Sequence, residues 1–176
     1  MIVMTTEQLL EKVSSQCDAL RNEVLTAGSE LMEFDKRLGQ ILQQLHKNIE
    51  VRDTAFAQEF NDFCQKLRAQ VNAQETAWIQ LRGDIRSRKD REWNGSLALA
   101  AKGLNSRAKT LSRASDEFIT MYDIFCKNYK NFTAAKLNVW LLTSCQTDVA
   151  NLTGKILFLA REIAQKTERN RIPYAS

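Results

Sequence analysis

One histidine and four cysteines are the residues in this sequence with the greatest potential for chemistry. The residue three positions before His46 is Gln43, so the glutamate of a di-iron helix motif is missing. Glycine-rich phosphate loops and the GxSxG nucleophile motif do not occur. The cysteines are far apart, form no CxxC pair and lack metal-ligand spacing; they are Cys17, Cys64, Cys126 and Cys145. We therefore expect no catalytic residue, no metal, no cofactor and no enzymatic activity.

The positions of the cysteines predict small buried hydrophobic residues. Cys17 and Cys145 lie on apolar helical patterns, and Cys64 and Cys126 each follow a phenylalanine. Free thiols favour a reducing, intracellular compartment. The apolar start of the chain is too short for a signal peptide, and no stretch approaches the ~20 apolar residues of a membrane-spanning helix. We expect a soluble cytoplasmic protein, with peripheral contact to a membrane as an option.

Positive charge is concentrated in one part of the chain. The whole sequence has a net charge of +4, but residues 82–113 contain nine basic and three acidic residues. The nine are Arg82, Arg86, Arg88, Lys89, Arg91, Lys102, Arg107, Lys109 and Arg113. One interpretation is a solvated surface, or one neutralised by Glu7, Glu11 and Asp18 near the start of the chain. The other is a binding site for phosphate, anionic lipid or an acidic partner.

The elements that would position these residues are helices. The chain has 176 residues, enough for one domain, with six glycines and a single proline, Pro173, which are too few for a turn-rich β or α/β fold. Apolar residues recur at alternating steps of three and four, typical of helices buried along one stripe. The first such seam comprises Leu10, Val13, Cys17, Leu20, Val24, Ala27, Leu31, Phe34, Leu38, Ile41 and Leu45. Thr5 or Thr6 suits the cap of this helix.

The pattern slips at residues 45–53 and again at residues 131–133. Each slip is either a turn or a stutter within a continuous helix. If they are turns, Asp53 or Thr54 would cap the second helix and Thr133 the fourth. Between the slips, Asn94 and Gly95 form a strong turn signal, and Ser96 suits the cap of the third helix.

Two architectures follow from these alternatives. With both slips as turns, the chain is a single all-α domain, an elongated up-down four-helix bundle with helices at about 6–48, 54–92, 97–130 and 133–170. With neither slip as a turn, it is a long antiparallel helical hairpin that dimerises as a coiled coil. We favour the bundle, because helices beyond about 40 residues are uncommon in globular chains. Both architectures bring the aromatic residues of 56–63 and 122–132 together at the end opposite the basic residues.

The strong seams and the absence of a catalytic motif favour a non-enzymatic helical interaction or scaffold protein, acting through helix faces with protein partners and itself as a homo-oligomer. The alternative is a module that binds an anionic surface through residues 82–113, with membrane lipid ahead of nucleic acid. A weaker alternative is a membrane-active protein that inserts residues 139–164.

Overall fold

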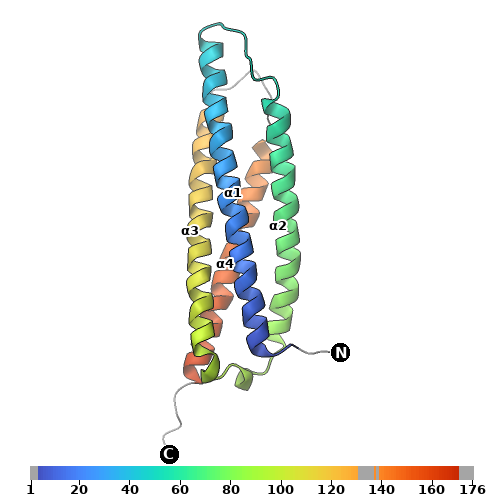
Figure 1. Ribbon diagram of the computed structural model, residues 1–176, viewed down its shortest axis with the longest axis vertical. Helices are drawn as coiled ribbons and strands as arrows, with labels where there is room; N and C mark the ends of the chain where they lie inside the picture. Colours follow the sequence, from blue (N-terminus) through green and yellow to red (C-terminus); the bar gives the residue numbers. More distant parts are fainter. Residues whose placement is uncertain (1–3, 131–136, 138, 171–176) are drawn as a thin grey trace, which may run out of the picture.

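The computed structural model describes residues 4–130, 137 and 139–170, and it is a bundle of four long helices (Figure 1). These are α1 (Thr6–His46), α2 (Phe56–Arg86), α3 (Ala98–Tyr129) and α4 (Val139–Arg169). Two short 3-10 helices, η1 (Asp90–Glu92) and η2 (Gly95–Leu97), connect α2 to α3. The described residues contain no strand, and the long helices run alternately up and down one axis. The predicted all-α up-down four-helix bundle is confirmed.

The slip at residues 45–53 is a turn. α1 ends at His46, and Asn48 takes a positive φ of 54°, which a continuous helix does not allow. The long two-helix hairpin is therefore wrong. The second slip, at residues 131–133, lies outside the described residues.

The order of the helices around the bundle differs from their order in the sequence. α1 packs most extensively on α3, and α3 on α4, while α2 makes fewer contacts with α1 and α4. The parallel pairs α1/α3 and α2/α4 are thus neighbours, and α2 and α3 lie at opposite corners. The chain between α2 and α3 crosses one end of the bundle, at the bottom of Figure 1. We call this end the closed end.

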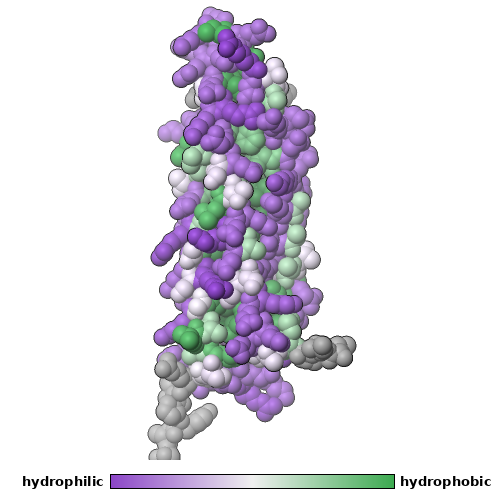
Figure 2. Space-filling model, in the orientation of Figure 1, coloured by the Kyte–Doolittle hydropathy of each residue, from purple (hydrophilic) through white to green (hydrophobic). Residues whose placement is uncertain are grey.

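The seams form the core of a single chain. Every member of the first seam except Leu45 is buried. Apolar residues at the same alternating spacing in α4, from Leu142 to Ile163, are buried throughout. The corresponding pattern in α3 ends with Tyr122 and Tyr129, which are half-buried, and Phe132, which lies outside the described residues. Figure 2 shows one face that is mostly hydrophilic, with hydrophobic patches separated by polar side chains. The seams that suggested self-association are therefore covered within the chain.

The predicted second helix, 54–92, is too long. α2 ends at Arg86, where the Ser87 hydroxyl donates to the Asp84 carbonyl at 2.7 Å. The chain then turns through η1 so that Trp93 enters the core, where it is 1% exposed. The Asn170 side chain at the end of α4 donates to the Trp93 carbonyl at 2.6 Å and holds this connection in place.

The other helix ends are closer to the predictions. α1 ends two residues before position 48, and α3 matches 97–130 within one residue at each end. α4 begins at Val139; Leu137, predicted to be helical, is not. The predicted start of the fourth helix at 133, with its cap Thr133, lies outside the described residues.

Thr5 caps α1, as one of the two predicted alternatives. Its hydroxyl accepts from the Gln8 amide at 3.1 Å, and its own amide donates to the Gln8 side chain at 2.9 Å. The cap predicted at Ser96 is wrong. Asn94 provides the side-chain cap at this turn, accepting from the Ser96 amide at 3.0 Å, and it caps η2 instead of α3.

The turn between α1 and α2 is held by Arg37, a residue the sequence did not single out. Its guanidinium donates twice to Asp53, at 2.7 and 2.8 Å, and once to Glu59 at 2.5 Å. It also lies over the rings of Phe34 and Phe56, 5.3 and 5.4 Å from their centroids. The predicted N-cap at Asp53 or Thr54 is wrong, because Ala55 occupies the N-cap position of α2. The Asp53 carboxylate instead binds Arg37 and lies against the backbone amides of Ala55 and Phe56.

Aromatic residues from the two halves of the chain meet toward the end of the bundle opposite the closed end, as predicted. Phe60 of α2 stacks on Phe125 of α3 with ring centroids 5.0 Å apart, and Phe125 stacks on Tyr129 at 6.4 Å. Phe60 and Phe125 are fully buried. These contacts support the interpretation that the aromatic residues fill the core.

Candidate functional site

The nine predicted basic residues lie toward the closed end of the bundle but do not form one surface. Arg82 and Arg86 lie on the last turns of α2, on the side facing α4. Arg88, Lys89 and Arg91 belong to the connection. The remaining four lie on α3, at the opposite corner from α2; they are Lys102, Arg107, Lys109 and Arg113. The predicted site is thus divided between two edges of the bundle.

Internal neutralisation accounts for only part of this charge. Arg107 pairs with Asp18 at 3.4 Å. Arg88 donates to the Met4 carbonyl and lies 3.9 Å from Glu92. The other seven side chains form no ion pair within the described ranges. Neutralisation by Glu7 and Glu11 was part of one of the two interpretations, and neither residue forms an ion pair with the nine.

The most distinctive surface feature is a groove of about 400 Å³ between α2 and α4, which we call the basic groove. α2 contributes Arg82 and Arg86 to one wall. α4 contributes Ala150, Asn151, Gly154, Lys155, Phe158 and Leu159. The groove is open because α2 and α4 make fewer contacts than the other neighbouring pairs, and because small residues occupy two successive turns of α4.

Charge and an exposed aromatic ring meet at the basic groove. Arg82, Arg86 and Lys155 have no ion-pair partner in the part of the chain that the structure describes. Phe158 is 65% exposed beside them, which is unusual for a phenylalanine. Guanidinium groups bind carboxylates and phosphates in bidentate fashion. The chemistry therefore suits a ligand that carries both negative charge and apolar surface.

Sequence reasoning found the α2 side of this groove and missed the α4 side. Lys155 and Phe158 lie more than 60 residues beyond Arg86 in the sequence, so only the fold brings them together. One signal was present, because Phe158 falls between the seam positions Ile156 and Leu159 and must point away from the core.

A second groove, of about 380 Å³, lies between α1 and α3. Gly28 and Met32 from α1 and Met121 from α3 line it, and Met32 is 44% exposed. Its only charged lining residue is Glu117. This groove offers an apolar surface with no cation, in contrast to the basic groove.

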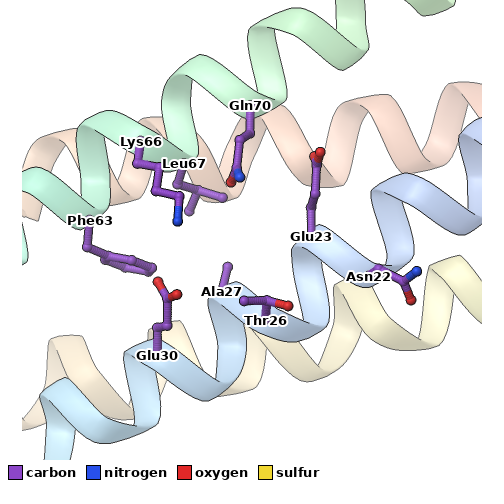
Figure 3. Close-up of a pocket in the computed structure, with 9 residues that line it drawn as sticks. All are labelled: Asn22, Glu23, Thr26, Ala27, Glu30, Phe63, Lys66, Leu67 and Gln70. Atoms are coloured by element: carbon purple, nitrogen blue, oxygen red, sulfur yellow. The ribbon is translucent and has the colours of Figure 1, made fainter.

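A smaller pocket, of about 170 Å³, lies between α1 and α2 (Figure 3). Glu30 from α1 and Lys66 from α2 reach toward the same opening, so the pocket has mixed charge. Beside it, Gln74 donates to Glu23 at 3.3 Å, and the Gln74 carbonyl accepts from Gln16 at 2.8 Å. Its volume is below the ~300 Å³ at which ligand pockets begin. We interpret it as part of the polar contact between these helices.

The cysteines carry no sign of reactivity. Burial raises the pKa of Cys17 and Cys64 to about 12 and that of Cys145 to about 11, so these thiols stay protonated at neutral pH. Cys126 is half-buried, and all four are free. These positions agree with the predicted role as buried hydrophobic residues.

The described residues offer neither a metal site nor a membrane-spanning helix. His46 is exposed at the end of α1. No cluster of metal-ligating side chains occurs among the described residues. None of the helices in these ranges combines the length and the apolar character needed to cross a membrane.

Comparisons with known proteins do not identify the chain: no family model matches it, and no curated protein and no solved structure matches it either.

Proposed function

We propose that this chain is a non-enzymatic helical interaction protein whose partner binds a surface groove rather than the hydrophobic seams. One observation carries the proposal. The apolar seams are buried within the chain, while in the basic groove Arg82, Arg86 and Lys155 form no ion pair with any described residue and lie beside the exposed Phe158. Unpaired cations next to an exposed aromatic ring are typical of a recognition surface. The four free cysteines favour an intracellular setting.

Glycine-to-leucine variants provide the test, because they fill one groove at a time. A Cβ at Gly28, Gly39 or Gly154 would meet no described atom within 4 Å, so a side chain can leave the backbone at each position without a clash at Cβ; circular dichroism melts verify that each leucine variant is folded. Gly154→Leu fills the basic groove, Gly28→Leu fills the α1–α3 groove, and Gly39→Leu changes an exposed position outside both. The measurement is quantitative capture of partners from cell extract by the tagged wild type and each variant.

We expect a partner whose capture is lost in one groove variant and retained with Gly39→Leu. A capture profile identical in all four proteins would contradict the proposal. Self-association is tested separately by light scattering over a range of concentrations. A dimer that weakens in either groove variant would make a second copy of the chain the partner, and a concentration-independent monomer would remove that option.

A second candidate function is binding of an anionic membrane surface by the closed end of the bundle. Its support is a set of exposed cations around that end that form no ion pair with a described residue: Arg86, Lys89, Arg91 and Lys102. The test is flotation with vesicles containing phosphatidylserine, at low and moderate salt, before and after all four are replaced with glutamine. Arg88 is left intact because it binds the Met4 carbonyl. Binding that is absent in the wild type or unchanged in the variant would eliminate this function; nucleic acid is tested the same way with RNA.

A further inference from the structure

We propose that the basic groove is the docking site for an acidic amphipathic α-helix of a partner protein. This inference rests on the proposed function and specifies the ligand class of the same surface. Three properties of the groove support it: its shape, its charge and its apolar rim.

The shape suits an elongated ligand that approaches closely. The α4 residues that line the groove run from Ala150 to Leu159, a distance of roughly 13 Å along the helix at ~1.5 Å per residue. Ala150 and Gly154 are four residues apart and face the same side. Small residues at this spacing let a second helix come near the backbone. A Cβ at Gly154 would meet no described atom within 4 Å, as at the other helix glycines, so the small residue leaves this part of the groove open.

The charges suit carboxylates at helical spacing. Arg82 and Arg86 are one turn apart on α2, and Lys155 lies on the opposite wall. A partner helix with glutamates at positions i and i+4 has their Cβ atoms about 6 Å apart, the same helical spacing as the two arginines. Each arginine then gains a bidentate partner, which no carboxylate among residues 4–130, 137 and 139–170 provides.

The rim provides an apolar anchor. Phe158 is 65% exposed at the groove, and Ile79, 54% exposed, lies three residues before Arg82 on the same face of α2. An amphipathic helix would cover these side chains with its apolar face while its acidic flank meets the arginines. A single phosphate would leave the apolar rim uncovered, and a flat membrane would not reach the groove floor. These features favour a helix over either alternative.

The test uses synthetic fluorescent peptides and the full chain. The probes are amphipathic helices of about 20 residues with glutamate pairs at i and i+4 and a leucine stripe, made in several relative registers. Control peptides replace glutamate with glutamine or scramble the sequence. Binding is measured by fluorescence anisotropy at low and moderate salt, with wild type, Gly154→Leu and Gly39→Leu. We expect Gly154→Leu to weaken binding at least tenfold and Gly39→Leu to change it less than twofold.

A charge variant makes the test independent of groove filling. Arg82→Gln with Arg86→Gln removes two charges from the groove, and Lys102→Gln with Lys109→Gln removes two exposed charges from α3, at the opposite corner. We expect at least tenfold weaker peptide binding for the first pair and less than threefold for the second. Circular dichroism melts verify that each variant is folded.

Several results would overturn the inference. These are failure of every acidic peptide to bind below millimolar concentration, equal binding of the scrambled peptide, and undiminished binding to Gly154→Leu. Two competition results would identify the groove as a site for an anionic headgroup instead. One is displacement of the acidic peptide by millimolar inorganic phosphate. The other is displacement by phosphatidylserine vesicles that is abolished in Gly154→Leu. If the peptides fail but Gly28→Leu abolishes capture of a cellular partner, the proposed function stands and only this inference falls.

Discussion

Replacing Arg37 with alanine is expected to destabilise the bundle more than any other single change to an ion pair on its surface. Arg37 joins α1 to the turn before α2 through Asp53 and Glu59, and its guanidinium lies over Phe34 and Phe56. Its side chain is 27% exposed and that of Asp53 is 28% exposed. Both are therefore partly shielded from the solvent that weakens most surface pairs.

The magnitude follows from these contacts. A partly buried bidentate pair contributes about 1 kcal/mol, at the upper end of surface ion pairs. Glu59, 54% exposed, adds little. Each cation–π contact adds about 0.5 kcal/mol. Arg37→Ala should therefore lower the free energy of unfolding by about 2 kcal/mol, which corresponds to a Tm lower by roughly 4–8 °C for a domain of this size.

The assay is urea denaturation followed by circular dichroism, with thermal melts alongside. Lys36→Ala is the matched control, since the Lys36–Glu33 pair is one residue away but 64% and 69% exposed. We expect this control to cost less than about 0.5 kcal/mol. Arg37→Lys keeps the charge but loses the bidentate fork, and its loss should be intermediate.

A double-mutant cycle isolates the pair itself. Arg37→Ala and Asp53→Asn, alone and together, should give a coupling energy of about 1 kcal/mol. A coupling energy of zero, or an Arg37→Ala variant no less stable than Lys36→Ala, would refute the reasoning. The turn between α1 and α2 would then be held by hydrophobic packing alone.

Three further predictions concern acid stability, helix glycines and thiol reactivity. Arg37 lowers the pKa of Asp53 below its usual 3.8. The stability that Asp53 contributes is therefore complete above pH 3.8 and is lost as the pH falls through the lowered pKa. Asp53→Asn should flatten this part of the acid-unfolding curve, and an unchanged curve would contradict the assignment. Gly39→Ala should raise the free energy of unfolding by about 0.5–1 kcal/mol, because a Cβ there meets open space, and a lower urea midpoint would show the reverse. Ellman's reagent should react faster with the half-buried Cys126 than with the three buried thiols, so a fastest phase that survives Cys126→Ser would refute the burial argument.

Local regularities in the sequence predicted most of the fold. Alternating steps of three and four identify the buried stripe of each helix, because side chains at that spacing share one face. Leu45 is the exception in the first seam, since the last turns of α1 extend beyond the first turn of α2 (Figure 1) and have less to pack against. The end of α2 was predicted six residues too late. The helix stops at Arg86 so that the following chain can turn and bury the large apolar side chain of Trp93.

The candidate site was predicted only in part. The sequence identified the cluster of basic residues, but linear proximity placed Arg86 and Lys102 in one site when they lie at opposite corners of the bundle. The reverse error applies to Lys155 and Phe158, which are distant in sequence and adjacent to Arg82 in space. A heptad pattern indicates which face of a helix is buried, but it does not identify the neighbouring helix, because the same apolar stripe can pack against any of the others.

By itself, the sequence determined that the chain is all-helical, which residues fill the core and where positive charge accumulates, because these depend on residue type and on helical periodicity. Only the tertiary structure decided that α2 neighbours α4 rather than α3, and therefore that two arginines of α2 share a groove with Lys155 and Phe158. That choice depends on how whole helix surfaces pack against one another over long sequence separations. Two residues of the basic region, Arg82 and Arg86, thus line a groove between parallel helices, and α4 provides the opposite wall of that groove.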